Sequence, residues 1–374
     1  MQESRREGGP ATRLVHAGAE RGAGEPSAPP IVAASFLTSG DPVGLPYAYG
    51  RDGNATWEAL EAALGALEDA EAVAFASGQA ASHALMLALT EERPRLVLPS
   101  DGYYNARKLA GMLRRTGIEP APLDLQDFDA VARALGGAPS VLWAETPTNP
   151  LLRVMDLQRL CALAAESGSP MIVDNTVATA VLQRPLEWGA AASLYSLTKA
   201  ASGHSDVILG AVVSRDGELL TRLRAWRSAA GGIPGPFEAW LAHRGLKTLP
   251  VRITRQSETA LAVARQLAAD GRVRCVHYPG LDAPTGSAAE RQMRGGFGPL
   301  LSFEVDGDAA SANRVVVGSR LVRPGTSFGG VESSWERRAR WPSETAPESL
   351  IRMSVGLEEA EDLLADLDLA LALA

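Results

Sequence analysis

The sequence predicts an α/β protein with an extended N-terminal arm, a large domain containing a mostly parallel β-sheet, and a smaller C-terminal α/β domain. Residues 1–46 are rich in Gly, Pro and Ser and show little periodicity. Short apolar runs then alternate with amphipathic stretches. After Leu249 this pattern gives way to a long helical stretch and shorter strands. We therefore expect the arm at 1–48, the large domain at 49–249 and the small domain at 250–374.

The large domain begins with a predicted helix at 57–68, where apolar residues recur at spacings of three and four among good helix formers. The expected strands are 72–76, 95–98, 140–144, 171–173, 191–195 and 207–213. The expected helices between them are 80–89, 106–116, 127–135 and 156–167. In a parallel sheet of this kind, ligands bind at the carboxyl ends of the strands.

The small domain is expected to open with a long helix at 253–270. Two strands, at 273–277 and 300–305, follow, and a helix near 358–373 closes the chain. These shorter strands indicate a second, smaller α/β unit.

Composition excludes several classes of protein. The 374 residues carry a net charge of −8, which argues against a nucleic-acid binder. The two cysteines stand in no paired motif and the five histidines are scattered, so we expect no metal site. The N-terminus has no apolar stretch and no apolar run approaches a membrane span, so we expect a cytoplasmic protein without membrane contact.

Three segments carry candidate chemistry. Lys199 lies among hydroxyl residues after a predicted strand, which suits an anion-binding pocket with a reactive amine. Taken alone, such a segment is more often part of the solvent-exposed surface. Asp174 ends an apolar run, where it could hold a pyridine nitrogen or simply cap a turn. In Phe75-Ala-Ser-Gly-Gln-Ala80 a strand meets a helix, either as an anion site or as an ordinary N-cap.

In this order along the chain, the motifs resemble the cystathionine γ-synthase, cystathionine γ-lyase and methionine γ-lyase family of pyridoxal 5'-phosphate (PLP) enzymes, which has fold type I. The resemblance spans nearly the whole chain. The motifs that carry it are Tyr47-Ala-Tyr-Gly-Arg-Asp-Gly-Asn-Ala-Thr56, Ser77-Gly78, Glu145-Thr-Pro-Thr-Asn-Pro150, Val173-Asp-Asn-Thr176, Ser196-Leu-Thr-Lys199 with Gly203-His-Ser-Asp206, Arg244-Gly-Leu-Lys-Thr-Leu249, Tyr278-Pro-Gly-Leu281 and Arg352-Met-Ser-Val-Gly-Leu-Glu358.

The resemblance implies roles for the cofactor-binding residues. Lys199 matches the lysine that bonds to PLP and later moves protons between the substrate carbons. Asp174 matches the partner of the pyridine nitrogen. The residues that match the phosphate cradle are Ser196, Thr198, Gly78 and Gln79.

Tyr49 and Arg51 match a pair that reaches the phosphate bound by a neighbouring subunit. The resemblance therefore implies a homo-oligomer, at least a dimer and typically a tetramer.

The resemblance also implies how an amino-acid substrate is held. Tyr103 matches the tyrosine that stacks on the cofactor ring and is a candidate acid for the leaving thiol. Arg352 matches the clamp for the substrate carboxylate, and Asn149 and Ser327 match supporting contacts.

Some positions near the substrate depart from the family pattern. Asn105 stands where methionine γ-lyases often have Cys, and Thr326 stands where enzymes that handle cystathionine often have Glu. We expect γ-elimination of L-methionine or a related thioether amino acid to thiol, 2-oxobutanoate and ammonia. A γ-replacement enzyme of the cystathionine γ-synthase or O-acylhomoserine sulfhydrylase type, a cystathionine γ-lyase and a non-catalytic relative are the alternatives.

Overall fold

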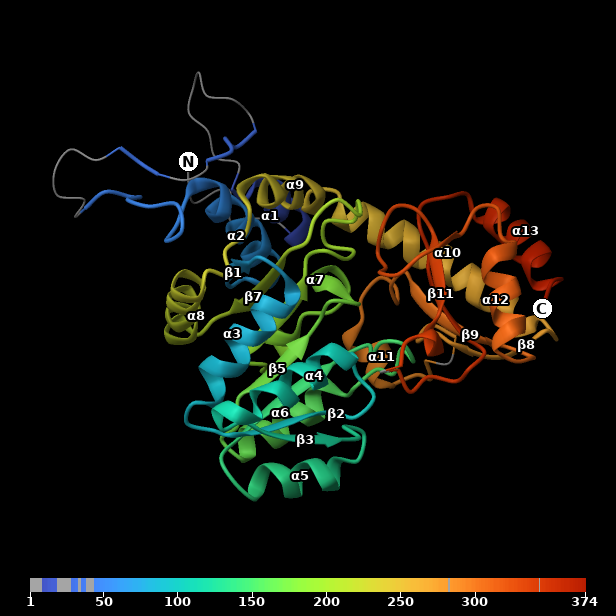
Figure 1. Cartoon of the computed structure of the whole chain (residues 1–374), viewed down its shortest axis with the longest axis horizontal. Helices are drawn as coiled ribbons and strands as arrows, with labels where there is room; N and C mark the ends of the chain where they lie inside the picture. The colour runs from blue at the N-terminus through green and yellow to red at the C-terminus, as the bar shows by residue number, and fades with distance from the viewer. Residues whose placement is uncertain (1–8, 19–27, 33–34, 38–43, 282, 343) are drawn as a thin grey trace.

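The computed structural model describes residues 9–18, 28–32, 35–37, 44–281, 283–342 and 344–374. The arm expected at 1–48 lies partly outside these ranges. The described residues form two β-sheets, each covered by helices, at opposite ends of an elongated molecule (Figure 1). No helix among the described residues has the length and apolar character that a bilayer crossing requires.

The first sheet has seven strands in the order β1-β7-β6-β5-β4-β2-β3. Its strands are β1 (Glu71–Phe75), β2 (Arg95–Pro99), β3 (Glu119–Leu123), β4 (Ser140–Glu145), β5 (Met171–Asp174), β6 (Ala192–Ser196) and β7 (Gly210–Ser214). Only β7 runs against its neighbours, and every other pairing in this sheet is parallel. The predicted α/β fold with a mostly parallel sheet is therefore confirmed.

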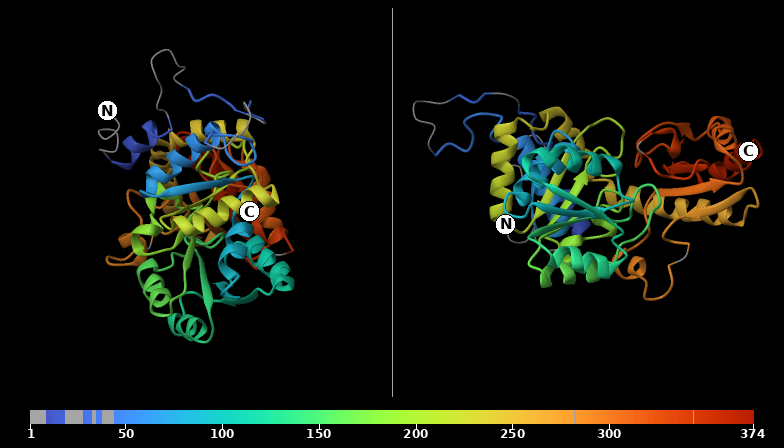
Figure 2. Two further views of the ribbon diagram at one scale, coloured as in Figure 1. Left: turned by 90° about the vertical axis from the view of Figure 1, so that its left-hand side faces the viewer. Right: turned by 60° about the horizontal axis from the view of Figure 1, so that its bottom comes forward.

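Helices cover both faces of this sheet, as the two rotated views show (Figure 2). They are α1 (Pro10–His16), α2 (Ala55–Glu68), α3 (Gly78–Thr90), α4 (Tyr104–Met112), α5 (Phe128–Gly136), α6 (Leu157–Glu166), α7 (Thr179–Leu182), α8 (Gly217–Ala230) and α9 (Pro236–Leu246). Side chains alternate along each strand: Val97 packs in the core shared with α2 and α6, whereas Leu96 and Leu98 pack in the core shared with α3 and α8. Both faces are buried, which explains the continuous apolar runs in the sequence.

The sequence prediction missed or misplaced some elements of this domain. The strand β3 was not expected because its sequence, Glu-Pro-Ala-Pro-Leu, contains two prolines. It lies at the edge of the sheet, where a residue without an N–H is tolerated. The last strand starts at Gly210 instead of Val207, and α8 and α9 were not predicted.

The second sheet has five strands in the order β10-β11-β12-β9-β8. The strands are β8 (Val273–His277), β9 (Leu300–Val305), β10 (Arg323–Pro324), β11 (Ser334–Arg337) and β12 (Leu350–Ser354). The helices of this part are α10 (Leu249–Ala269), α11 (Ala288–Gln292), α12 (Ala309–Gly318) and α13 (Ala360–Leu371). Apolar residues of α10, α12 and α13 pack with this sheet in a core of their own.

The long helix α10 joins the two parts. Its first turns pack in the core of the large sheet through Leu249 and Ile253, and its later turns pack in the core of the small one. Buried Arg252 donates to the carbonyls of Ala200 and Ala201, just after Lys199. One turn later, buried Gln256 donates to the carbonyl of Gly330 at 2.8 Å. The helix therefore fixes the loop before β11 against the segment that carries Lys199. The domain boundaries at 48/49 and 249/250 stay predictions.

Because Gly210 has no side chain, β7 can approach the start of α3 closely. A Cβ at this position would lie 2.4 Å from the Ser77 carbonyl oxygen and 2.6 Å from the Gly78 nitrogen. We expect Gly210→Ala to lower the thermal midpoint, by an overpacking cost of about 1–3 kcal/mol or more, and to weaken ligand binding at the Ser77–Gly78 turn.

Thermal unfolding measured by circular dichroism tests this expectation, with Gly217→Ala as the control. A Cβ at Gly217 would meet nothing within 4 Å, so this variant should unfold like the parent chain. Equal midpoints for the two variants would contradict the proposed packing constraint.

Candidate active site

A cavity of about 260 Å³ lies where the carboxyl ends of β4, β5 and β6 meet the start of α3 and the loop before β11. Ten of the twelve site residues expected from the sequence line it: Gly78, Gln79, Tyr103, Asn149, Asp174, Ser196, Thr198, Lys199, Ser327 and Arg352. The other two, Tyr49 and Arg51, do not line it. Tyr49 is 47% exposed, and Arg51 lies over its ring and donates to the Ser228 carbonyl.

One end of the cavity is built to receive an anion. The 13-residue helix α3 starts there at Gly78, and Ser77 caps it by accepting from the Ala80 N–H at 3.0 Å. Backbone N–H groups in a first helical turn attract anions. A Cβ at Gly78 would lie 3.0 Å from the Cβ of Ser196, so glycine allows the helix start and the β6 end to approach closely. The Thr198 hydroxyl also lines this space while bonding to Leu209.

Asp174 ends β5 with its carboxylate facing the cavity. It accepts from the Thr176 N–H at 3.1 Å. Burial raises the pKa of Asp174, and the hydrogen bonds from Thr176 oppose that rise. A protonated ring nitrogen beside this carboxylate would favour its ionised form.

Lys199 lies in the turn after β6, and its Nζ donates to the Ser327 hydroxyl at 2.7 Å. The Lys199 Nζ also lies 5.2 Å from the centre of the buried Phe328 ring. Burial, reinforced by the positive charge of Arg352, lowers the pKa of Lys199 from 10.5 to about 8. The amine is therefore nucleophilic closer to neutral pH than an exposed lysine.

Arg352 lies on β12 and is 4% exposed. Its guanidinium donates to the Asn149 side chain at 2.8 Å, to the Ser327 carbonyl at 3.0 Å and to Glu336 at 2.8 Å. The structure thus brings Asn149 and Ser327, two residues expected near Arg352, into contact with its guanidinium. Burial lowers the pKa of Arg352 to about 10, with Arg338 adding to the effect and Glu336 opposing it.

Glu336 was not expected at the site. It is 1% exposed, and one of its oxygens accepts from Arg352 and Arg338. The other oxygen accepts from Trp341 and forms an ion pair with Arg340 at 2.8 Å. Burial opposes its ionisation, but Arg352 and these other donors hold the pKa of Glu336 below its usual value. Its partners Arg338, Arg340 and Trp341 are close to it in the sequence, but Arg352 reaches it only through the pairing of β11 with β12, so no local pattern links Glu336 to the site.

Glu145 is the first residue of one of the family motifs, but it was not expected as a site residue. It ends β4 directly opposite Asp174 in the parallel register, and it accepts from the backbone N–H groups of Tyr103 at 2.6 Å and Asn149 at 2.7 Å. Burial and the negative charge of Asp174 raise the pKa of Glu145 to about 8. A sequence signal could have indicated this residue, because Glu145 and Asp174 each end an apolar strand, and the carboxyl ends of parallel strands meet at one edge of the sheet.

The residues present fit PLP. The helix start at Gly78 and the hydroxyls nearby suit its phosphate, the buried carboxylate of Asp174 suits its ring nitrogen, and the Lys199 amine suits its aldehyde. Because Gly78 lies close to Ser196, the cavity is narrow at the end that suits the phosphate.

Comparison with known proteins agrees with this geometry. The model of the Cys/Met metabolism PLP-dependent enzyme family matches residues 11–372. The chain belongs to this family. It is 45% identical over 369 residues to a candidate cystathionine gamma-lyase of Streptomyces coelicolor, with 96% of this chain and 92% of the relative covered. It is 40% identical to the cystathionine gamma-synthase of Mycobacterium tuberculosis, with 97% of each chain covered.

A solved structure from Micromonospora echinospora, described as a cystathionine gamma-lyase, matches with a TM-score of 0.91 at 40% identity and covers 97% of this chain and 98% of its own. A second structure of the same enzyme, described as a methionine gamma-lyase, matches with a TM-score of 0.89 and covers 96% and 98%. The chain is therefore a PLP-dependent enzyme of fold type I, of the lyase and synthase group of sulfur amino-acid metabolism.

The lowered pKa of Lys199 generates a second prediction. The neutral amine, which attacks the cofactor aldehyde, becomes the major form as pH rises through about 8. We expect the rate of PLP incorporation into the PLP-free protein to rise with a midpoint near pH 8, measured by stopped-flow absorbance of the lysine-bound cofactor.

N-α-acetyl-lysine amide provides the reference for an unburied amine, and its reaction should increase with pH up to about 10.4. A midpoint near that of the reference would contradict the buried environment of Lys199. Lys199→Ala should show no formation of the lysine-bound cofactor band at any pH.

Proposed function

We propose that this enzyme catalyses γ-elimination of L-methionine, or of a related thioether amino acid with an uncharged distal end, to a thiol, 2-oxobutanoate and ammonia. The observation that carries the proposal is the neutral outer part of the cavity. Thr326, Ile208 and Trp341 line the cavity and are exposed. They offer no carboxylate to a distal ammonium group.

The carboxylates that line the described cavity belong to Asp174 and Glu145. Both lie at the strand ends, where Asp174 accepts from Thr176 and Glu145 accepts from the backbone of Tyr103 and Asn149. A substrate with a second ammonium group, such as cystathionine, therefore finds no free counter-charge among these residues. A thioether with an uncharged distal end needs no counter-charge in the outer cavity, so its binding is not weakened there.

Each protein group has a task in this proposal. Arg352 binds the substrate carboxylate, and Asn149, Ser327 and Glu336 hold its guanidinium in place. Lys199 removes the Cα proton and carries protons between substrate carbons. PLP, when bound, withdraws electrons from the substrate so that these C–H bonds become acidic.

Tyr103 donates the proton that the leaving sulfur needs. Burial raises the pKa of Tyr103, so the phenol keeps its proton at neutral pH. Asn105 donates to the phenol oxygen at 2.9 Å and orients it. The Asn105 side chain thus supports Tyr103 although it replaces the cysteine often found in methionine γ-lyases.

The γ-replacement and cystathionine-cleaving reactions form the second candidate function. The names of the relatives from Mycobacterium tuberculosis and Streptomyces coelicolor favour it. The cofactor-binding residues serve these reactions equally, because the early proton transfers are common to all of them. The difference lies in what enters the outer cavity.

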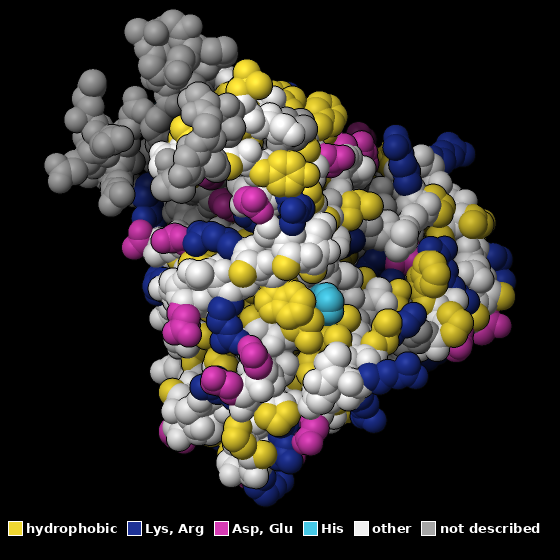
Figure 3. Space-filling view, turned by 60° about the vertical axis from the view of Figure 1, so that its left-hand side comes forward, with side chains coloured by type: hydrophobic (Ala, Val, Ile, Leu, Met, Phe, Trp, Pro, Cys, Tyr) yellow, Lys and Arg dark blue, Asp and Glu magenta, His cyan; other side chains and the backbone are white. Residues whose placement is uncertain are grey.

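We further propose that the active enzyme is a homo-oligomer. It contains at least two subunits, and we propose a tetramer. Tyr49 and the cavity residue Ile208 are 47% and 67% exposed. Hydrophobic side chains gather on the face that carries α3 and α8 (Figure 3), where Trp226 is 37% exposed. A second subunit would cover such apolar surface and bring its Tyr49 and Arg51 to the phosphate end.

The third prediction tests the reaction. PLP-loaded protein incubated with L-methionine alone should release methanethiol and 2-oxobutanoate in equal amounts, measured with a thiol reagent and lactate dehydrogenase. Lys199→Ala is the control and should release neither. Release from cystathionine but not from methionine, or turnover only when a thiol accompanies an activated homoserine, would contradict the proposal and support the second candidate.

The fourth prediction concerns Thr326. Thr326→Glu places a carboxylate at the neutral outer cavity, so we expect kcat/KM for cystathionine to rise relative to methionine by roughly fivefold, the value of an exposed ion pair of about 1 kcal/mol. Thr326→Gln has the same size without the charge and is the matched control. Equal ratios in the two variants would show that charge at this position does not select the substrate.

A further inference from the structure

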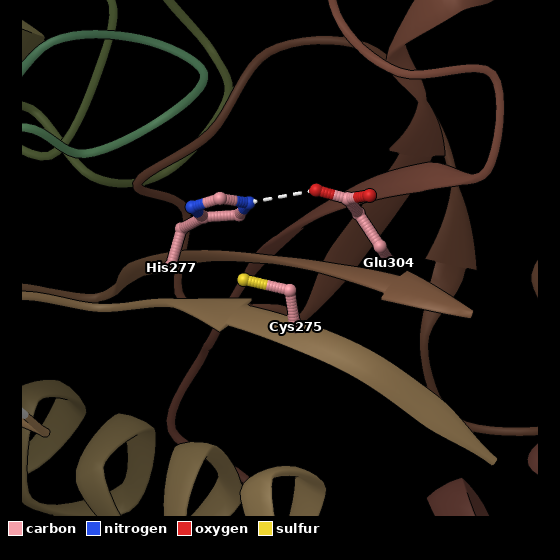
Figure 4. Close-up of side chains that lie close together, drawn as sticks. All are labelled: Cys275, His277 and Glu304. Carbon is pink, nitrogen blue, oxygen red and sulfur yellow. Dashed lines mark hydrogen bonds and ion pairs between the residues drawn. The ribbon is translucent and has the colours of Figure 1, made fainter. Parts of the chain in front are cut away.

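A second cluster of reactive side chains lies on the small sheet, away from the cavity. Cys275 and His277 on β8 and Glu304 on β9 place one Sγ, one imidazole nitrogen and one carboxylate oxygen within 4.8 Å of one another (Figure 4). The His277 Nε2 lies 3.1 Å from the Glu304 Oε1. None of these residues lines the candidate active site.

A β-bulge creates this cluster. Val273 pairs with Val305 and Val276 pairs with Phe303, and the core of the small sheet includes Phe303 and Val305. Between these two pairs, β8 has one residue more than β9. Without that extra residue Cys275 would lie opposite Phe303, but with it Cys275 lies opposite Glu304. Bulges re-aim side chains in this way next to functional sites.

The atoms suit a borderline-soft divalent cation. Thiolate sulfur, imidazole nitrogen and carboxylate oxygen are the three ligand types that Zn²⁺ takes, at about 2.0–2.3 Å. Ligands around one tetrahedral ion lie roughly 3.3–3.8 Å apart, so small side-chain rotations bring the described atoms to that distance. A thiolate and a carboxylate with a neutral histidine carry two negative charges, which the ion would balance.

The setting is partly open. Cys275 is exposed, and the side chains of His277 and Glu304 are 24% and 15% exposed. Three protein ligands with access to solvent leave the fourth position of a tetrahedral ion to water or an exchangeable ligand. Because β8 is the edge strand of its sheet, an ion here would also tie that edge to β9.

We propose that Cys275, His277 and Glu304 form a Zn²⁺ site with one exchangeable position. This site is separate from the reaction proposed above and does not depend on it. The sequence did not predict it because Cys275 and His277 are separated by one residue, a spacing typical of no zinc motif, and Glu304 is 27 residues further along the chain.

Co²⁺ binding to the PLP-loaded, chelator-treated protein tests the proposal. We expect one Co²⁺ per chain, with a thiolate-to-cobalt charge-transfer band and the strong visible bands of tetrahedral coordination, displaced by Zn²⁺. Cys275→Ser should lose the charge-transfer band, and His277→Ala and Glu304→Gln should weaken binding at least tenfold. Difference spectra against the triple variant remove the absorbance of PLP.

Two matched controls use residues outside the cluster. Cys161→Ala removes the buried cysteine, and His16→Ala removes an exposed histidine, so both should bind Co²⁺ like the parent chain. The triple variant should keep its circular dichroism spectrum, because none of the three side chains packs in the core of the small sheet. Co²⁺ binding that is equally tight in the triple variant, or that lacks the charge-transfer band in the parent chain, would overturn the proposal.

Discussion

Buried Arg352, which is paired with Glu336 on the neighbouring strand, connects the two sheets at the point where substrate is expected. Glu336 comes from the small sheet, and Arg352 on the neighbouring strand reaches Asn149 of the large domain. Removing one member of a buried ion pair leaves an unpaired charge and costs about 3–5 kcal/mol. The orientation of Arg352 therefore depends on the small sheet being docked, and α10 holds that docking through Arg252 and Gln256.

Parallel strands provide the second constraint. Because β4 and β5 end in register, Glu145 and Asp174 come side by side at one sheet edge. Burial, with the negative charge of Asp174 adding to the effect, raises the pKa of Glu145 to about 8. Protonated Glu145 can still accept from the Tyr103 and Asn149 N–H groups. The carboxyl thus positions one residue expected to act on the leaving sulfur and one that supports Arg352.

In the small sheet, one extra residue in β8 changes which side chains face the core and which face solvent. Apolar residues of β8 and β9 face the core shared with α10 and α12, and the bulge after Val273 turns Cys275 to the opposite face. Regular alternation would have kept the thiol against the core. The same irregularity explains why a site of three residues formed with no recognisable spacing in the sequence.

The sequence by itself determined the α/β fold, because apolar periodicity is a local property. The resemblance of its motifs to a known family, which is also read from local segments, indicated ten of the residues that meet in one cavity. The edge strand β3 escaped prediction because its prolines are tolerated only at an edge, which is a property of the sheet. The pairing of Glu336 with Arg352 and the cluster of Cys275, His277 and Glu304 were decided by tertiary structure alone. Each of these depends on strand register or on docking of the two sheets, and the physical reason is the same: burial and charge at a residue depend on neighbours that are distant in the sequence.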